Sequence, residues 1–270
     1  MSRIAVAQIA IRVGDVASNV AQARDLIAEA GRQGAELVIL PECFTTGLAA
    51  NVADLAEPIP GPTSDTLAQA AAGADCWVVA GMVERGHEAI HNASVVIRPS
   101  GEIAATYRKC YLYVGEDQVF ARGGRACVVD LGFAVAGITI CYDYVFPEYI
   151  RELALRGSQL LVHSTAWVDT DDCQRWHYPA AQAYRAQLQV RALENGIFAA
   201  SANNFGPYDA AGQLRCVGQS CIIAPWGEYL AQLGEGSGVA VADCDFARAA
   251  DWAATVAPYM RDFKNVPRPV

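Results

Sequence analysis

The pattern of apolar and polar positions switches repeatedly between the strand period and the helix period along the chain. Alternating or continuous apolar runs predict strands at residues 3–10, 37–40, 77–82, 93–98, 103–107, 128–131, 133–140, 159–163 and 197–201. Helical spacing predicts helices at about 18–30, from about 63, at 146–156 and over a long stretch that ends at 194. No linker interrupts this pattern, so we expect one continuous α/β domain over residues 1–245, followed by a tail over 246–270.

Three boundaries of the predicted elements can be compared with a structure. Ser18 or Asn19 is expected to cap the first helix, since short polar side chains accept hydrogen bonds from free N–H groups there. Pro147 suits the first turn of the helix at 146–156. The Asp-rich segment that follows the strand at 159–163 is expected to be a loop.

The composition excludes several classes of protein. The chain has 270 residues, of which 53% are hydrophobic and 18% charged, a balance typical of a globular domain. Its net charge of -9 and the lack of a basic block argue against a nucleic-acid partner. Its apolar runs are shorter than the roughly 18–20 residues that cross a membrane, and its start does not resemble a signal peptide. We therefore expect a cytoplasmic protein without membrane contact.

The nine cysteines form no C-x-x-C pair, and their number is odd. A chain of this length can fold without covalent cross-links, so we expect reduced thiols, most of them buried as small apolar side chains. The segment HEAIH at 87–91 has the spacing of a zinc-binding helix. Gly86 and the strand-like flanks favour a hairpin there instead, and we predict no metal site.

Candidate chemistry gathers where predicted strands end. Cys141 lies between an apolar strand and a helix, a position that exposes a nucleophile near free N–H groups. No histidine stands in a recognisable pair with it, so a cysteine hydrolase would need another base. Glu42, directly after a buried strand, could accept the proton, and Lys109, at the end of another, could supply a cation.

These residues lie in segments that resemble the nitrilase superfamily of carbon–nitrogen hydrolases. The family pattern has an acid in L-P-E, a lysine in Y-R-K and a cysteine in C-x-D-x-x-F-P-E. This chain has LPE at 40–42, YRK at 107–109 and CYDYVFPE at 141–148. Further similar segments are the start AVAQIA with Asn19, the His91-Asn92 turn, Glu116 seven residues after Lys109, and RALENGIFAASANNFG at 191–206. The resemblance therefore extends over residues 4 to about 243.

The resemblance implies an α-β-β-α sandwich and a cofactor-free enzyme. It assigns Cys141 as nucleophile, Glu42 as general base, Lys109 as oxyanion stabiliser and Glu116 as a second acid that positions the substrate or the lysine. It also implies a homodimer or larger homo-oligomer, paired through the helices near 146–156 and 179–194, with the tail contacting a partner subunit.

The branch of the superfamily follows from the residues after Cys141. True nitrilases generally have C-W-E, whereas this chain has C-Y-D, the form of amidases and carbamoyl-amide hydrolases, so we favour a small linear amide as substrate. Asp143 is expected to fix the turn by hydrogen bonds, and Tyr142, Phe146 and Trp167 are the candidates for the pocket wall. An N-carbamoyl-amine, a nitrile and a non-catalytic scaffold remain as alternatives.

Overall fold

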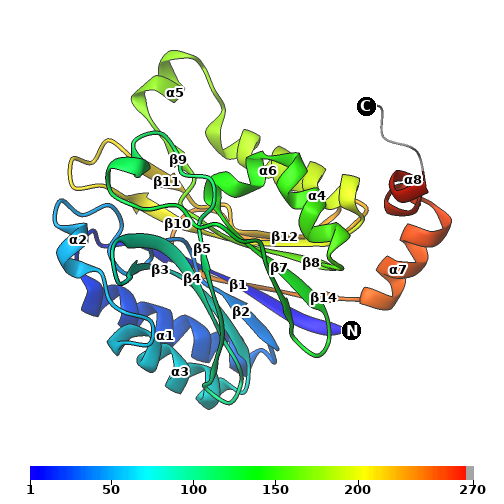
Figure 1. Cartoon of the computed structure of the whole chain (residues 1–270), viewed down its shortest axis with the longest axis horizontal. Coiled ribbons are helices and arrows are strands. Elements are labelled where there is room, and N and C mark those ends of the chain that lie inside the picture. Colours follow the sequence, from blue (N-terminus) through cyan, green and yellow to red (C-terminus); the bar gives the residue numbers. More distant parts are fainter. Residues whose placement is uncertain (266–270) are drawn as a thin grey trace.

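The structure is a computed structural model of the chain and describes residues 1–265 (Figure 1). The strands are β1 (Ser2–Ala10), β2 (Leu37–Ile39), β3 (Trp77–Arg85), β4 (Ile90–Ile97), β5 (Ile103–Arg108), β6 (Cys127–Asp130), β7 (Val135–Ile140), β8 (Leu160–Thr165), β9 (Val168–Asp169), β10 (Phe198–Pro207), β11 (Arg215–Val217), β12 (Cys221–Ile223), β13 (Tyr229–Gln232) and β14 (Gly238–Cys244). The α-helices are α1 (Val16–Arg32), α2 (Val52–Leu55), α3 (Pro62–Ala74), α4 (Pro147–Leu155), α5 (Asp171–Arg175), α6 (Ala180–Asn195), α7 (Phe246–Thr255) and α8 (Tyr259–Asn265). Two short 3₁₀ turns, η1 (Glu116–Gln118) and η2 (Cys141–Val145), complete the order.

The strands form two sheets that meet at one point. The first has the order β5-β4-β3-β2-β1-β14, and the second has the order β6-β7-β8-β10-β12-β13. They are joined where the last residues of β1 pair with β10, through Ile9 with Asn204 and Ala10 with Phe205. The two sheets are therefore continuous through the carboxyl ends of β1 and β10.

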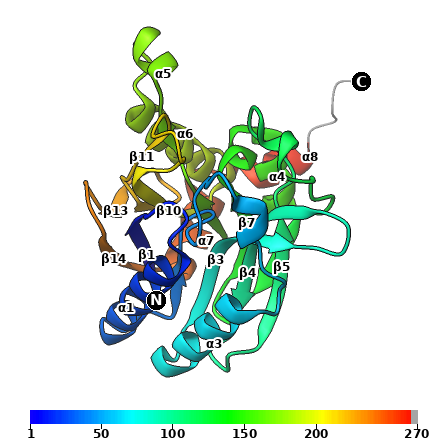
Figure 2. The same cartoon turned by 90° about the vertical axis from the view of Figure 1, so that its left-hand side faces the viewer.

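The sheets pack face to face between two layers of helices. Val6 and Ile39 of the first sheet lie in one fully buried cluster with Ile138 and Val162 of the second. Helices α1 and α3 cover the outer face of the first sheet, whereas α4 and α6 cover the second (Figures 1 and 2). The predicted α-β-β-α sandwich is confirmed, because each sheet is apolar on both faces and needs a cover on each.

Two local expectations differ from the structure. Helix α1 is capped by Asp15, whose carboxylate accepts from the Ser18 N–H (3.1 Å), and not by Ser18 or Asn19. Asn19 is instead buried, and its amide donates to the carbonyls of Arg12 and Thr45. That side chain holds the loop that follows Glu42 against the start of α1.

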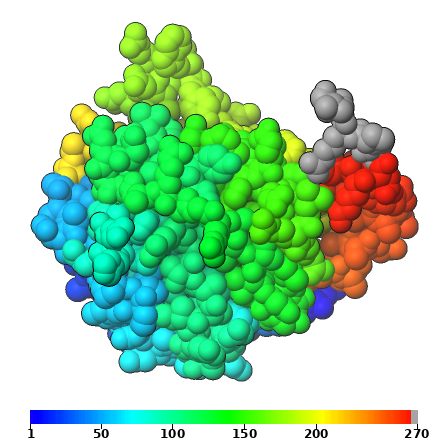
Figure 3. Space-filling view, viewed as in Figure 1, coloured from blue at the N-terminus to red at the C-terminus, as the bar shows by residue number. Residues whose placement is uncertain are grey.

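The Asp-rich segment contains a short helix, α5, because Thr170 caps it by accepting from the Cys173 N–H (3.1 Å). Helix α5 projects from the body of the molecule (Figures 1 and 3). The tail holds helices α7 and α8, and the Phe246 ring packs against Phe198 at 5.0 Å. The rest of the predicted tail, 266–270, lies outside the described residues. None of the helices described here has the length and hydropathy needed to cross a membrane.

Candidate active site

The three residues expected to carry the chemistry follow strand ends that the fold brings together. Glu42 follows β2, Lys109 follows β5 and Cys141 follows β7 directly. Their side chains are nearly inaccessible, with exposed fractions of 2%, 1% and 9% respectively. A cluster of charged groups this deeply buried is stable only when the charges are paired and hydrogen-bonded.

Lys109 lies between two carboxylates. Its Nζ donates to Glu42 Oε1 at 2.7 Å and to Glu116 Oε1 at 2.9 Å. Glu42 Oε2 accepts from the Ala166 N–H at 2.7 Å, so both oxygens of this base are hydrogen-bonded. The structure thus brings Glu116, predicted from the resemblance alone, into direct contact with the predicted lysine.

Asn92 also belongs to this cluster, although no role was predicted for it. Its Nδ2 donates to Glu42 Oε1 at 2.7 Å and lies 3.5 Å from Glu116 Oε1, so one amide bridges both acids. The register of β4 against β5 places it there, because the Lys109 N–H donates to the Asn92 carbonyl at 2.9 Å. The sequence signal was the His91-Asn92 turn, one of the segments that resemble the nitrilase superfamily.

Cys141 occupies a sharp turn between β7 and η2. Its φ is +42°, a left-handed conformation that non-glycine residues adopt rarely and that recurs at functional sites. Asp143 fixes this turn as expected, since its carboxylate accepts from the Ile140 N–H at 2.9 Å. It also accepts from the Tyr111 N–H at 2.9 Å and from the Tyr107 hydroxyl at 2.7 Å.

Burial and neighbouring charges shift the ionisation of the cluster. Burial and the Glu42 carboxylate raise the pKa of Cys141, whereas Lys109 and the Thr165 hydroxyl lower it. Burial acts to lower the pKa of Lys109, but Glu42, Cys141 and Glu116 outweigh it and raise that pKa well above its usual value. Burial also raises the pKa of Glu116. Lys109 is thus a permanent cation, and Cys141 is a thiol that needs a base.

Of the three candidates for the pocket wall, the structure brings two together. The Tyr142 and Phe146 rings meet edge to face with their centroids 5.2 Å apart. Trp167 instead makes ring contacts with Tyr144 at 5.3 Å and Tyr184 at 6.0 Å, and its buried Nε1 has no partner among the described residues. Their roles in substrate binding stay predictions.

The HEAIH segment is not a helix. His87 lies in the turn between β3 and β4, while His91 lies on β4, where its Nδ1 is 2.9 Å from the Ala121 carbonyl oxygen. Two histidines one helical turn apart are needed for the zinc motif, and this hairpin does not provide them. Within residues 1–265, no group of three potential metal ligands is found.

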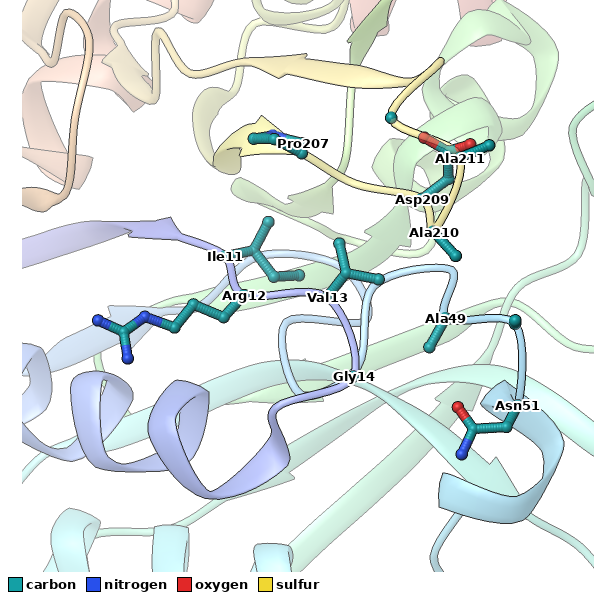
Figure 4. A pocket seen from close by; sticks show the side chains of 12 residues that line it. Ile11, Arg12, Val13, Gly14, Ala49, Asn51, Pro207, Asp209, Ala210 and Ala211 are labelled. Atoms are coloured by element: carbon teal, nitrogen blue, oxygen red, sulfur yellow. The ribbon is translucent and has the colours of Figure 1, made fainter.

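The cluster of Glu42, Lys109, Glu116 and Cys141 is separate from an open groove of about 710 Å³ at the carboxyl ends of β1 and β10. Ile11, Val13 and Ala49 line that groove, and Arg12 points away from Asp209 (Figure 4). Small side chains and backbone form most of its surface, so nothing there matches the chemistry of the strand-end cluster.

A carboxylate, an ammonium and a thiol at the strand ends of this sandwich are the groups that a cysteine hydrolase without a catalytic histidine needs. The family model described as carbon-nitrogen hydrolase matches residues 3–254, so the chain belongs to this family. It is a carbon–nitrogen hydrolase of the nitrilase superfamily, with amidases among its relatives.

Curated relatives and solved structures agree on this placement. A nitrilase from Pyrococcus abyssi is 34% identical, with 87% of this chain and 86% of the relative covered. An (R)-stereoselective amidase from Pseudomonas sp is 32% identical, with 86% and 81% covered. A CN-hydrolase superfamily protein from Xanthomonas campestris, with an arsenic adduct in its active site, superposes with a TM-score of 0.86 at 26% identity, covering 100% and 98% of the two chains.

Proposed function

We propose that this enzyme hydrolyses a small linear amide to a carboxylic acid and ammonia without a cofactor. The observation that carries the proposal is the hydrogen-bonded set of Glu42, Lys109 and Glu116 beside the strained turn at Cys141. Relatives named as amidases and omega-amidases support an amide as substrate. A solved Nesterenkonia amidase, 28% identical, carries the acetamide moiety of fluoroacetamide on its active-site cysteine.

In the first half of the reaction, Glu42 accepts the thiol proton while the sulfur of Cys141 bonds to the amide carbon. The charge that develops on the carbonyl oxygen is stabilised by Lys109 and by the Tyr142 N–H. The carbon–nitrogen bond then breaks, and Glu42 returns the proton to the leaving nitrogen, so ammonia departs and a thioester remains. Loss of one oxyanion donor typically slows such a reaction about 100- to 1,000-fold.

In the second half, Glu42 takes a proton from water, which attacks the thioester carbon. The carbon–sulfur bond breaks, the acid leaves, and the sulfur of Cys141 recovers a proton. Glu116 holds Lys109 in place through both halves, since it contacts the ammonium at 2.9 Å. Each half uses the same base and the same oxyanion donors.

An N-carbamoyl-amine or a nitrile is the alternative substrate for this site. Both place an electrophilic carbon next to nitrogen, and the relative from Pyrococcus abyssi is named a nitrilase. The residues after Cys141 favour the amide, because Tyr142 and Asp143 form the C-Y-D segment typical of amidases. Product analysis identifies a carbamoyl-amine, since its hydrolysis releases carbon dioxide. An amide and a nitrile both give a carboxylic acid and ammonia, so the rates on the two compounds are compared directly.

The test is intact-protein mass spectrometry after brief incubation with a panel of amides, carbamoyl-amines and nitriles, together with an ammonia assay. We expect an adduct on Cys141 whose mass identifies the acyl group, and no adduct or ammonia with Cys141→Ala. Cys127→Ala is the matched control, because it removes a half-buried thiol on β6 and should keep full activity. Full activity in Cys141→Ala would contradict the proposal.

We also propose a cytoplasmic homodimer or larger homo-oligomer, paired through α4 and α6, with the tail helices contacting a partner subunit. All nine cysteines are free thiols, which suits a reducing compartment. Light scattering of the purified protein tests the assembly. A monomer at micromolar concentration would contradict it.

A further inference from the structure

A series of aromatic rings leads from the nucleophile to the protein surface. The Tyr142 ring, directly after Cys141, meets the Phe146 ring edge to face at 5.2 Å. On its other side it meets the Tyr113 ring at 5.3 Å, also edge to face. Tyr113 has 46% of its surface exposed, whereas Cys141 has 9%. The three rings therefore form a wall of continuous ring contacts from the residue next to Cys141 to an exposed side chain.

Tyr113 is also hydrogen-bonded to the cluster of Glu42, Lys109 and Glu116. Its backbone N–H donates to Glu116 Oε2 at 2.7 Å, and Glu116 in turn binds Lys109. Burial raises the pKa of Tyr113, and so do Cys173 and Cys141. Tyr113 therefore contacts both the residue directly after Cys141 and the acid that binds Lys109.

The charges around this wall disfavour an anionic substrate. The cluster has two carboxylates and one ammonium, and that ammonium is already hydrogen-bonded to both acids. Helix α5, whose Cys173 lies near Tyr113, begins with Asp171 and Asp172. Its Arg175 lies over the Trp176 ring, 5.8 Å from the centroid. These groups comprise more acids than cations, so a carboxylate on the substrate would meet net negative charge here.

We propose that Tyr113, Tyr142 and Phe146 form a subsite for the acyl substituent, which selects neutral amides with an aromatic or bulky apolar group and rejects amides with a second carboxylate. Aromatic walls bind such groups through apolar contact and edge-to-face geometry. The inference rests on the proposed function, since it takes Cys141 as the nucleophile. Tyr113 becomes a selectivity residue that no sequence motif identified.

The test compares the kcat/KM values of four amides, measured by ammonia release. The amides are 3-phenylpropionamide, propionamide, succinamate and 4-aminobutyramide. We expect 3-phenylpropionamide to be the best substrate, at least tenfold ahead of succinamate. Tyr113→Ala should lower the ratio of kcat/KM for 3-phenylpropionamide to that for propionamide by about 2- to 10-fold, mainly through KM, because one ring contact is lost. Tyr113→Phe keeps the ring and should keep the ratio.

The matched control is Tyr259→Ala, which removes a tyrosine of similar exposure, 49%, from α8. It should leave the order of the four amides unchanged. If Tyr113→Ala fails to fold, Phe146→Leu replaces the ring at similar volume and should lower the same ratio.

Faster hydrolysis of succinamate or 4-aminobutyramide than of 3-phenylpropionamide overturns the inference and leaves the proposed function intact. An unchanged ratio in folded Tyr113→Ala also overturns it. Failure of the wild-type enzyme to hydrolyse any of the four amides counts against the proposed function itself.

Discussion

The Tyr107 hydroxyl donates a 2.7 Å hydrogen bond to the Asp143 carboxylate. This contact links β5, which precedes Lys109, to the turn that begins at Cys141. Tyr107 lies on β5, two residues before Lys109, while Asp143 lies two residues after Cys141. Both side chains are buried. The relative positions of the ammonium and the thiol thus depend on a carboxylate that need not take part in the chemistry.

Removing the Tyr107 hydroxyl should destabilise the fold in a pH-dependent way. Burial raises the pKa of Asp143 to about 6, and the hydrogen bond from Tyr107 opposes this rise because it favours the ionised carboxylate. In Tyr107→Phe we therefore expect a loss of about 1.5–3 kcal/mol in the free energy of unfolding at pH 8, where Asp143 is charged. The loss should be smaller at pH 5, where Asp143 is protonated. Urea unfolding at both pH values measures it.

The direction of the pH dependence follows from the linkage between folding and the protonation of Asp143. The folded pKa of Asp143 lies above its ordinary value of 3.8, so the folded state binds more protons between about pH 4 and 6, and this group's contribution to stability falls as pH rises through that window. Tyr149→Phe is the control, because the Tyr149 hydroxyl donates to Tyr107 and not to the carboxylate. An equal loss at pH 5 and pH 8 in Tyr107→Phe would contradict the assignment.

Asn92 should matter for activity although no role was predicted for it from the sequence. Asn92→Leu keeps the volume but removes the amide that donates to Glu42 at 2.7 Å. We expect kcat to fall about 10- to 100-fold and the free energy of unfolding to fall by about 1–3 kcal/mol, because a buried carboxylate loses a donor. Ser94→Ala on the same strand removes a hydroxyl without a partner among the described residues and should change stability little. Equal effects of the two substitutions would refute the assigned role.

Replacing Lys109 should reveal the cost of two buried carboxylates without their cation. Lys109→Met is expected to lower the free energy of unfolding by about 3–5 kcal/mol, since Glu42 and Glu116 both lose their ion pair. Adding Glu116→Gln should recover part of this stability, because one of the unpaired charges is gone. Activity should remain lost in both variants, as neither has the oxyanion cation. A double-mutant cycle from urea unfolding measures the coupling, and additive effects would show that the pair does not interact.

The Thr165 hydroxyl should contribute to the reactivity of Cys141. It is fully buried, and its approach to the Cys141 sulfur lowers the pKa of that thiol, while no other hydrogen-bond partner is found for it among the described residues. Thr165→Val should therefore raise that pKa and slow alkylation of Cys141 by iodoacetamide near neutral pH by about 2- to 10-fold. Thr165→Ser keeps the hydroxyl and should restore the rate.

Ser164→Ala serves as the comparison for Thr165, since successive residues of β8 point to opposite faces of the sheet. It removes a buried hydroxyl that also lacks a partner among the described residues. Peptide mapping identifies the alkylated cysteine. An unchanged pH profile of alkylation in Thr165→Val would exclude the contribution.

Much of the fold could be predicted because apolar periodicity is a local property. The strand at 3–10 and the hairpin that contains HEAIH followed from it, and the structure has them at Ser2–Ala10 and at Trp77–Arg85 with Ile90–Ile97. The cap of α1 was predicted wrongly, because Asn19 has the chemistry of a cap but is drawn inward by the carbonyls of Arg12 and Thr45. A local preference is overridden when a tertiary contact satisfies the same group.

By itself, the sequence determined that Glu42, Lys109 and Cys141 follow strand ends, since chemistry and strand periodicity can both be read from neighbouring residues. Only the tertiary structure decided which other groups meet them. Asn92 reaches Glu42 because β4 pairs with β5 in one register, and Tyr113 reaches Tyr142 because two loops distant in sequence end at the same face. Register and loop closure depend on contacts between remote segments, and no local pattern contains them.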